Sequence, residues 1–112
     1  MPTKVDINNP FMVQEWIRRG IASAREIKYS FEYTVEERLQ AGETIKGMER
    51  SLMSLNGICV LHMQQEYRRE LGKIAWWKFR VRRDFERNKF EWEMAKREAL
   101  IAEAAAVESF EL

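Results

Sequence analysis

Residues 58–107 carry the strongest structural signal in this chain: ICVLHMQQEYRRELGKIAWWKFRVRRDFERNKFEWEMAKREALIAEAAAV. The stretch contains no proline and only one glycine, Gly72. An apolar stripe follows nearly all of it in steps of three and four residues, apart from one step of seven that passes over Asn88. This spacing is typical of an amphipathic helix. The stripe consists of Val60, Met63, Tyr67, Leu71, Ile74, Trp77, Val81, Phe85, Trp92, Ala95 and Ala99.

A helix of that length does not fit inside a compact domain of this size. At about 1.5 Å per residue it would extend for roughly 75 Å. A compact chain of 112 residues has a radius of gyration of only about 13 Å. The sequence therefore predicts an elongated all-α protein. The alternative is a bend at Gly72, the one position where the helix could fold back, which would give a compact four-helix bundle.

A first, shorter helix is predicted over residues 10–31. Asn9 is a favourable N-cap, and Pro10 suits the first helical position, where its missing N–H costs nothing. Residues 27–35 also alternate strictly between apolar and polar, which is a strand pattern. Because no convincing partner strand exists in the sequence, helix is favoured at the end of this segment and a strand is the alternative.

A second helix is predicted over residues 35–55. Thr34 and Glu37 form a capping box, in which each side chain satisfies a backbone N–H of the first turn. Asn56-Gly57 is a typical helix stop and turn. We therefore expect one helical domain, residues 1–112, in which the two shorter helices pack on the first half of the long C-terminal helix 58–107.

Composition places the chain among folded soluble proteins, with 46% hydrophobic and 33% charged residues. The net charge of +1 excludes a global field that would attract nucleic acid. Charge is nevertheless uneven, because residues 68–89 carry nine basic and three acidic side chains. A single cysteine, Cys59, forms no intramolecular disulfide and suggests a reducing compartment. With no signal-like or membrane-spanning apolar run, a cytoplasmic location is expected.

The second half of the long stretch is apolar on two opposite sides. Ile74, Val81 and Phe85 share one side, whereas Trp76 and Phe79 fall on the other. A helix that is apolar on two sides has to be covered on both. We therefore expect a contact surface for a second copy of the chain, as a dimer, or for another protein. Its predicted residues are Trp76, Phe79, Phe90, Trp92, Met94 and Ile101.

Catalytic and metal chemistry is not expected. Cys59, His62 and Glu66 share one side of a helix and have ligand-type side chains. However, the chain has only one cysteine and one histidine, whereas a structural zinc site uses four such ligands. The sequence therefore predicts no enzyme activity, no cofactor and no metal.

The segment 73–89 mixes basic and aromatic side chains, as proteins that bind unpaired nucleic acid do. The residues that would contact phosphates are Arg80, Arg82, Arg83, Arg87 and Lys89. They lie at many angles around the helix, and Asp84 and Glu86 interrupt them, so nucleic-acid binding is the second hypothesis. A membrane contact is less favoured because the helix lacks one polar face opposed to one apolar face.

The function expected from the sequence is non-catalytic. We expect a small helical adaptor, assembly or regulatory protein that acts through protein–protein contacts of its C-terminal half. A small inhibitor of a larger complex, of the kind a phage encodes, fits the same features.

Overall fold

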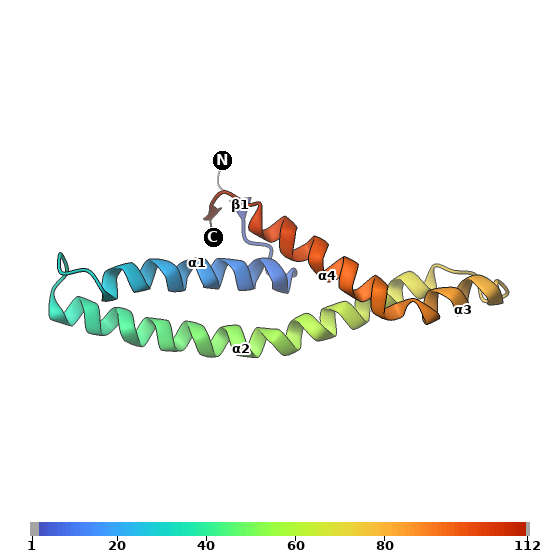
Figure 1. Ribbon diagram of the computed structural model, residues 1–112, viewed down its shortest axis with the longest axis horizontal. Helices are drawn as coiled ribbons and strands as arrows, with labels where there is room; N and C mark the ends of the chain where they lie inside the picture. Colours follow the sequence, from blue (N-terminus) through green and yellow to red (C-terminus); the bar gives the residue numbers. More distant parts are fainter. Residues whose placement is uncertain (1–2, 112) are drawn as a thin grey trace.

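The computed structural model describes residues 3–111 of the chain. They form an elongated all-α structure of 67 × 29 × 19 Å with a radius of gyration of 19.1 Å (Figure 1). The elongated all-α prediction is confirmed. The described elements are β1 (Thr3–Lys4), α1 (Pro10–Lys28), α2 (Val35–Gly72), α3 (Phe79–Arg87), α4 (Lys89–Ala105) and β2 (Phe110–Glu111).

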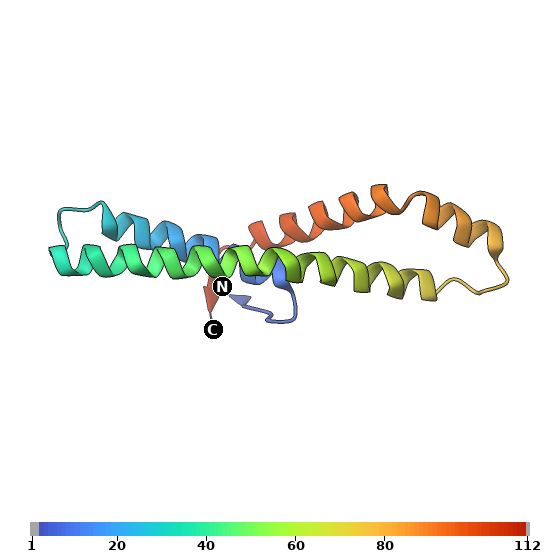
Figure 2. The same cartoon turned by 90° about the horizontal axis from the view of Figure 1, so that it is seen from below.

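The long helix is in a different place from the one predicted. It is α2, with 38 residues, and it passes through Asn56-Gly57 without a turn. The predicted helix 58–107 is wrong, because it breaks after Gly72 and again at Asn88. The arrangement has four helices rather than three, and the reversal after Gly72 brings α4 back along α2 (Figure 2).

Tertiary contacts explain why α2 does not stop at Asn56. The Asn56 side-chain oxygen accepts a hydrogen bond of 2.9 Å from the Gln14 amide of α1, and Gln14 is buried. One and two turns later, Cys59 and Met63 pack against Phe11 of α1. A helix stop at a glycine usually needs a left-handed backbone. No glycine between residues 3 and 111 has a positive φ.

The reversal after Gly72 is held by a side chain from α3. The Arg82 guanidinium donates hydrogen bonds to the backbone carbonyls of Leu71 (3.1 Å) and Ile74 (2.9 Å). The Leu71 carbonyl lies in the last turn of α2 and also accepts a hydrogen bond from the Ile74 N–H (3.1 Å), and the Ile74 carbonyl lies in the turn that follows α2. Arg82 therefore caps α2 from outside and fixes the turn formed by residues 73–78.

The first hairpin forms largely as its local signals predict. Asn9 accepts backbone hydrogen bonds at the start of α1, and Thr34 and Glu37 make the complete capping box at the start of α2. Helix α1 ends at Lys28 rather than at residue 31, and the strand considered for residues 27–35 does not form. The core between the two helices consists of Ile21, Ala24 and Ile45, with Ile17, Met48 and Leu52 packed around it.

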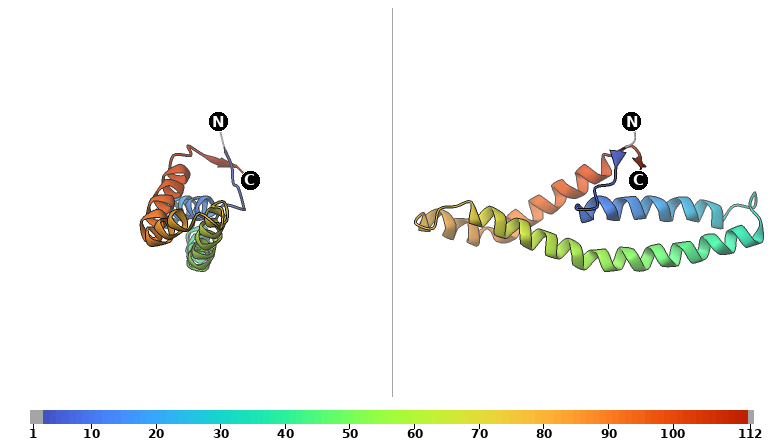
Figure 3. Two further views of the ribbon diagram at one scale, coloured as in Figure 1. Left: turned by 90° about the vertical axis from the view of Figure 1, so that its right-hand side faces the viewer. Right: turned by 180° about the vertical axis from the view of Figure 1, so that it is seen from behind.

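A second core joins α4 to the hairpin. Trp92 and Leu100 of α4 pack on Phe11, Cys59 and Met63. Figure 3 shows α4 to one side of the α1–α2 pair, and the two chain ends close together. There β1 pairs with β2 in parallel.

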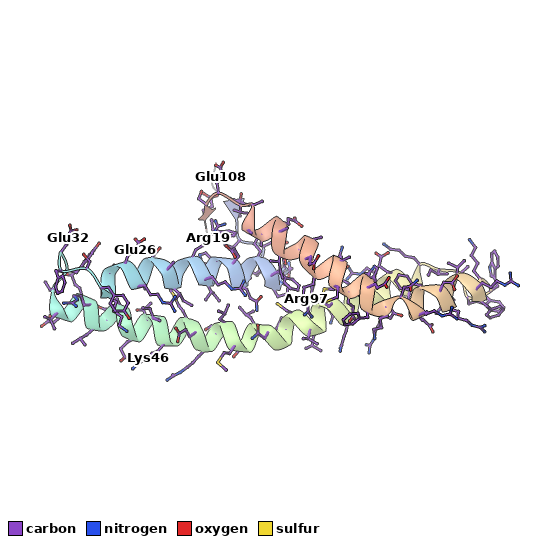
Figure 4. All side chains as sticks on the ribbon, in the orientation of Figure 1. Arg19, Glu26, Glu32, Lys46, Arg97 and Glu108 are labelled. Atoms are coloured by element: carbon purple, nitrogen blue, oxygen red, sulfur yellow. The ribbon has the colours of Figure 1, made fainter. Side chains whose placement is uncertain are left out.

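Arg19 of α1 holds the C-terminal segment against the rest of the structure. Arg19 donates hydrogen bonds to the carbonyls of Ala105 and Glu108, at 3.3 Å each. Its guanidinium also lies 4.7 Å from the centroid of the Phe110 ring. Figure 4 shows Arg19 on α1 below the chain segment that carries Glu108.

Candidate protein-contact surface

The structure leaves most of the predicted contact residues open to solvent. Trp76 is 75% exposed, Phe79 64% and Phe90 74%. Met94 and Ile101 are also classed as exposed. Large apolar side chains are seldom left this open in a cluster unless a partner covers them.

Trp76 and Phe79 form the outer end of the molecule, beside the turn after α2. Their rings meet edge to face with centroids 6.4 Å apart. Trp77, which the sequence assigned to the core stripe, is 60% exposed, and the Lys78 ammonium lies 5.3 Å from its ring. The tip therefore presents two tryptophans and a phenylalanine among basic side chains.

Helix α4 carries a second set of exposed apolar side chains. Phe90, Met94 and Ile101 recur at spacings of four and seven residues, which places them on one face of a helix. The opposite face of α4 carries Trp92 and Leu100, which the chain itself covers. The chain therefore covers Trp92 and Leu100 on the inner side of α4, whereas Trp77 and Val81 of the same predicted stripe are 60% and 52% exposed. We call Trp76, Trp77, Phe79, Phe90, Met94 and Ile101 the arm surface.

Trp92 does not belong to the arm surface, contrary to expectation. It is half-buried and meets the rings of Tyr67 and Phe85 edge to face, with centroids 5.7 Å and 6.0 Å apart. Tyr67 and Phe85 stack on each other at 5.2 Å. The Lys89 ammonium lies 4.7 Å from the Tyr67 ring centroid. This aromatic cluster joins α2, α3 and α4 and is structural.

The environment of the Tyr67 hydroxyl agrees with a structural role. Burial raises the pKa of Tyr67, and the nearby carboxylates of Glu86 and Glu93 raise it further, whereas Arg82 opposes them. The phenol therefore stays neutral across the physiological range.

The predicted basic residues divide into two groups. Arg82 caps α2 and Lys89 lies over Tyr67, so both already have partners within the chain. Arg80, Arg83 and Arg87 lie three and four residues apart on α3 and therefore share one face. All three are exposed, and no ion pair joins them to a carboxylate within the described part of the chain.

The Cys59 region lacks the features of a reactive site. Cys59 is buried, and burial raises the pKa of its thiol against the weaker opposing effect of Arg97 and Arg18. The His62 ring packs edge to face on Phe11, with centroids 6.3 Å apart. Over residues 3–111, no group of three or more potential metal-ligating side chains comes together.

Two exposed features were missed from the sequence. The loop between α1 and α2 presents Tyr29 and Phe31, and Phe31 is 91% exposed beneath the Arg38 guanidinium. The strand-like alternation of residues 27–35 is the sequence pattern that could have indicated these exposed aromatic side chains, since every second side chain of this loop is apolar. The second feature is a groove between α1 and α2.

None of the helices in the described residues has the length and apolarity needed to cross a membrane. Comparison of the chain with family models, curated proteins and solved structures finds no match.

Proposed function

We propose that this protein is a non-catalytic adaptor, assembly or regulatory protein that binds another protein through the arm surface. The observation that carries the proposal is the exposure of Trp76, Trp77 and Phe79 at one end of the molecule. Tryptophan, tyrosine and arginine dominate the binding energy of protein interfaces. An end that combines two of these residue types fits such a role.

The charge around the arm surface indicates the chemistry of the partner. Residues 68–89 carry nine basic and three acidic side chains, and Arg80, Arg83 and Arg87 extend from the same end of the molecule. Complementary charge at the rim of an interface accelerates association and selects partners. The partner that fits best is a protein with an apolar groove bordered by carboxylates.

The test is quantitative affinity isolation from the native host, with two variants compared. Trp76→Ala combined with Phe79→Ala should remove the partner, because it deletes the centre of the surface. Phe31→Ala, at the other end of the molecule, is the matched control and should retain it. The proposal fails if both variants recover the same proteins as the parent chain.

The exposed arginine face of α3 supports nucleic-acid binding as the second candidate function. Phosphate contacts weaken steeply as salt is raised. The test is binding of a single-stranded oligonucleotide at low salt, by the parent chain and by a variant in which Arg80, Arg83 and Arg87 are all changed to glutamine. If the parent chain binds the oligonucleotide and the variant does not, this second function replaces the first. If the parent chain does not bind the oligonucleotide at low salt, nucleic-acid binding is excluded as the function.

A further inference from the structure

A long groove runs between α1 and α2. One section has a volume of about 520 Å³ and is lined by Trp16, Ile17, Gly20, Thr44, Gly47, Met48 and Ser51. The next section, about 420 Å³, is lined by Ile7, Asn8, Pro10, Val13, Leu55, Ile58, Leu61, His62 and Gln65. These residues differ from Phe11, Cys59 and Met63, on which α4 packs. The groove is therefore left uncovered by the described part of the chain.

The lining of the groove has the composition of an interface core. One third of the chain consists of Asp, Glu, Lys and Arg, so about five of the sixteen lining residues would be charged if the lining were ordinary surface. None of them is. Depletion of charge is what distinguishes the core of a protein interface from the rest of the surface.

The two sections of the groove differ in the size of their side chains. On the α2 side, the first section is lined by the small residues Thr44, Gly47 and Ser51 together with Met48. On the α1 side it is lined by Trp16, Ile17 and Gly20, and Met48 fills the space beside Gly20. Leu55, Ile58 and Leu61 line the second section. Ile58 and Leu61 are 50% and 57% exposed and stand out from the surface. Both sections are hollowed, but the α2 edge of the groove carries mostly small side chains in the first section, which we call the hollow half, and large ones in the second, which we call the bulky half.

We infer that a second copy of this chain docks in the groove, with its α2 antiparallel to the first. An antiparallel two-fold arrangement places the bulky half of each copy in the hollow half of the other. Leu61 then faces the partner's Thr44, Ile58 faces the partner's Gly47, and the axis passes between residues 52 and 53. A parallel pairing would put small residues opposite small ones and leave voids, which close-packed interfaces avoid.

Charge at the two ends of the groove agrees with this register. Arg68 is exposed and forms no ion pair among the described residues. Glu36 and Glu37 lie in the first turn of α2. With the axis between residues 52 and 53, Arg68 falls opposite residue 37 of the other copy. The antiparallel pairing therefore sets opposite charges beside each other at both ends, whereas the parallel one sets like charges together.

The chain exposes more surface than a compact monomer of its mass. Its accessible surface is 8582 Å², whereas a compact monomer of 13.4 kDa exposes about 6,500 Å². The excess of about 2,000 Å² belongs to the elongated molecule as a whole, and a standard interface would bury roughly 800 Å² of each partner. Closed two-fold dimers are the commonest oligomers, and their interfaces use the same patch twice.

Analytical ultracentrifugation of two matched variants tests the interface. Ser51→Glu introduces a carboxylate into the hollow, whereas Met53→Glu introduces one at an exposed position of α2 that does not line the groove. At about 100 μM, where a dimer of micromolar Kd is largely formed, the parent chain and Met53→Glu should have twice the 13.4 kDa monomer mass. Ser51→Glu should have the monomer mass with unchanged helix content.

The arm surface provides the control that separates this inference from the proposed function. Trp76→Ala combined with Phe79→Ala should stay dimeric, because the inference does not rest on the arm surface. A monomeric parent chain overturns the inference. So does a dimer that survives Ser51→Glu but is lost in the arm variant.

A distance between spin labels tests the direction of pairing. A label at exposed Leu39, in a Cys59→Ala background whose dimer mass is verified first, lies 13 to 14 residues from the axis. At about 1.5 Å per residue, two such labels are about 40 Å apart in the antiparallel dimer. In a parallel dimer they are roughly one interhelical spacing of about 10 Å apart, and that result overturns the inference.

Discussion

Replacing Gly57 with alanine should make this protein more stable. Gly57 lies in the interior of α2, and no residue of the chain has a positive φ between positions 3 and 111. A Cβ atom added to Gly57 meets nothing within 4 Å. Alanine therefore fits the position without strain or collision, and only the difference in helix propensity and in the entropy of the unfolded chain remains.

That difference is about 1 kcal/mol in favour of alanine in a helix interior. For a chain of 112 residues, a gain of this size raises the melting temperature by about 4 °C. Urea denaturation followed by circular dichroism should show a higher midpoint with an unchanged slope, since the surface exposed on unfolding is the same. Gly72→Ala, at the last residue of α2, should gain less because it is not in the interior.

The sign of the change distinguishes two folds. If the chain turned at Asn56-Gly57, as local sequence signals suggest, Gly57 would adopt the left-handed conformation that ends many helices. Alanine in that conformation costs about 1–2 kcal/mol. A lower urea midpoint for Gly57→Ala would therefore refute the continuous α2 and restore the predicted helix break.

Three further substitutions probe packing and burial. Asn56→Ala leaves the buried Gln14 amide without its 2.9 Å partner and should lower the free energy of unfolding by about 1–3 kcal/mol in urea; an unchanged midpoint would mean that water replaces it. Trp92→Ala should lower the free energy of unfolding by about 3 kcal/mol. Phe90→Ala, at an exposed site, should change it by no more than about 0.5 kcal/mol. Equal effects of the two substitutions would contradict the division of α4 into covered and open sides. Because burial raises the pKa of Cys59, its neutral thiol stabilises the fold at neutral pH, and this contribution should be lost as the pH rises above about 8.5. The parent chain should therefore lose stability relative to Cys59→Ala in that range, and parallel pH curves would contradict this.

Features set by neighbouring residues could be predicted from the sequence. The Asn9 cap and the Thr34–Glu37 capping box depend on side chains that reach their own first turn, and both form. The two apolar sides of the C-terminal half also follow from helical periodicity alone. Phe90, Met94 and Ile101 are accordingly exposed together on one side of α4, whereas Trp76 is exposed in the turn 73–78, where helical periodicity does not apply.

The positions of the helix breaks could not be predicted in the same way. Asn56-Gly57 is a strong local stop, but its cost of about 1 kcal/mol is offset by contacts with residues more than forty positions earlier, such as the hydrogen bond from Gln14. The turn after Gly72 depends on Arg82, which reaches back from the next helix. Two breaks left a local trace in the sequence: the break at Asn88 in the single step of seven in the apolar stripe, and the break after Gly72 in that glycine, the alternative bend position.

The groove and the arm surface lie on different parts of the molecule, so both can be occupied at once. In the antiparallel dimer, Gly72 lies about 20 residues from the axis, which places the two copies of this residue about 60 Å apart. The arm surfaces that follow it then sit at opposite ends of the assembly. A dimer of this shape bridges two partner molecules, or two sites on one partner, and the second contact gains the effective concentration that the first provides. The groove would then determine how strongly the arm surface binds without contacting the partner itself.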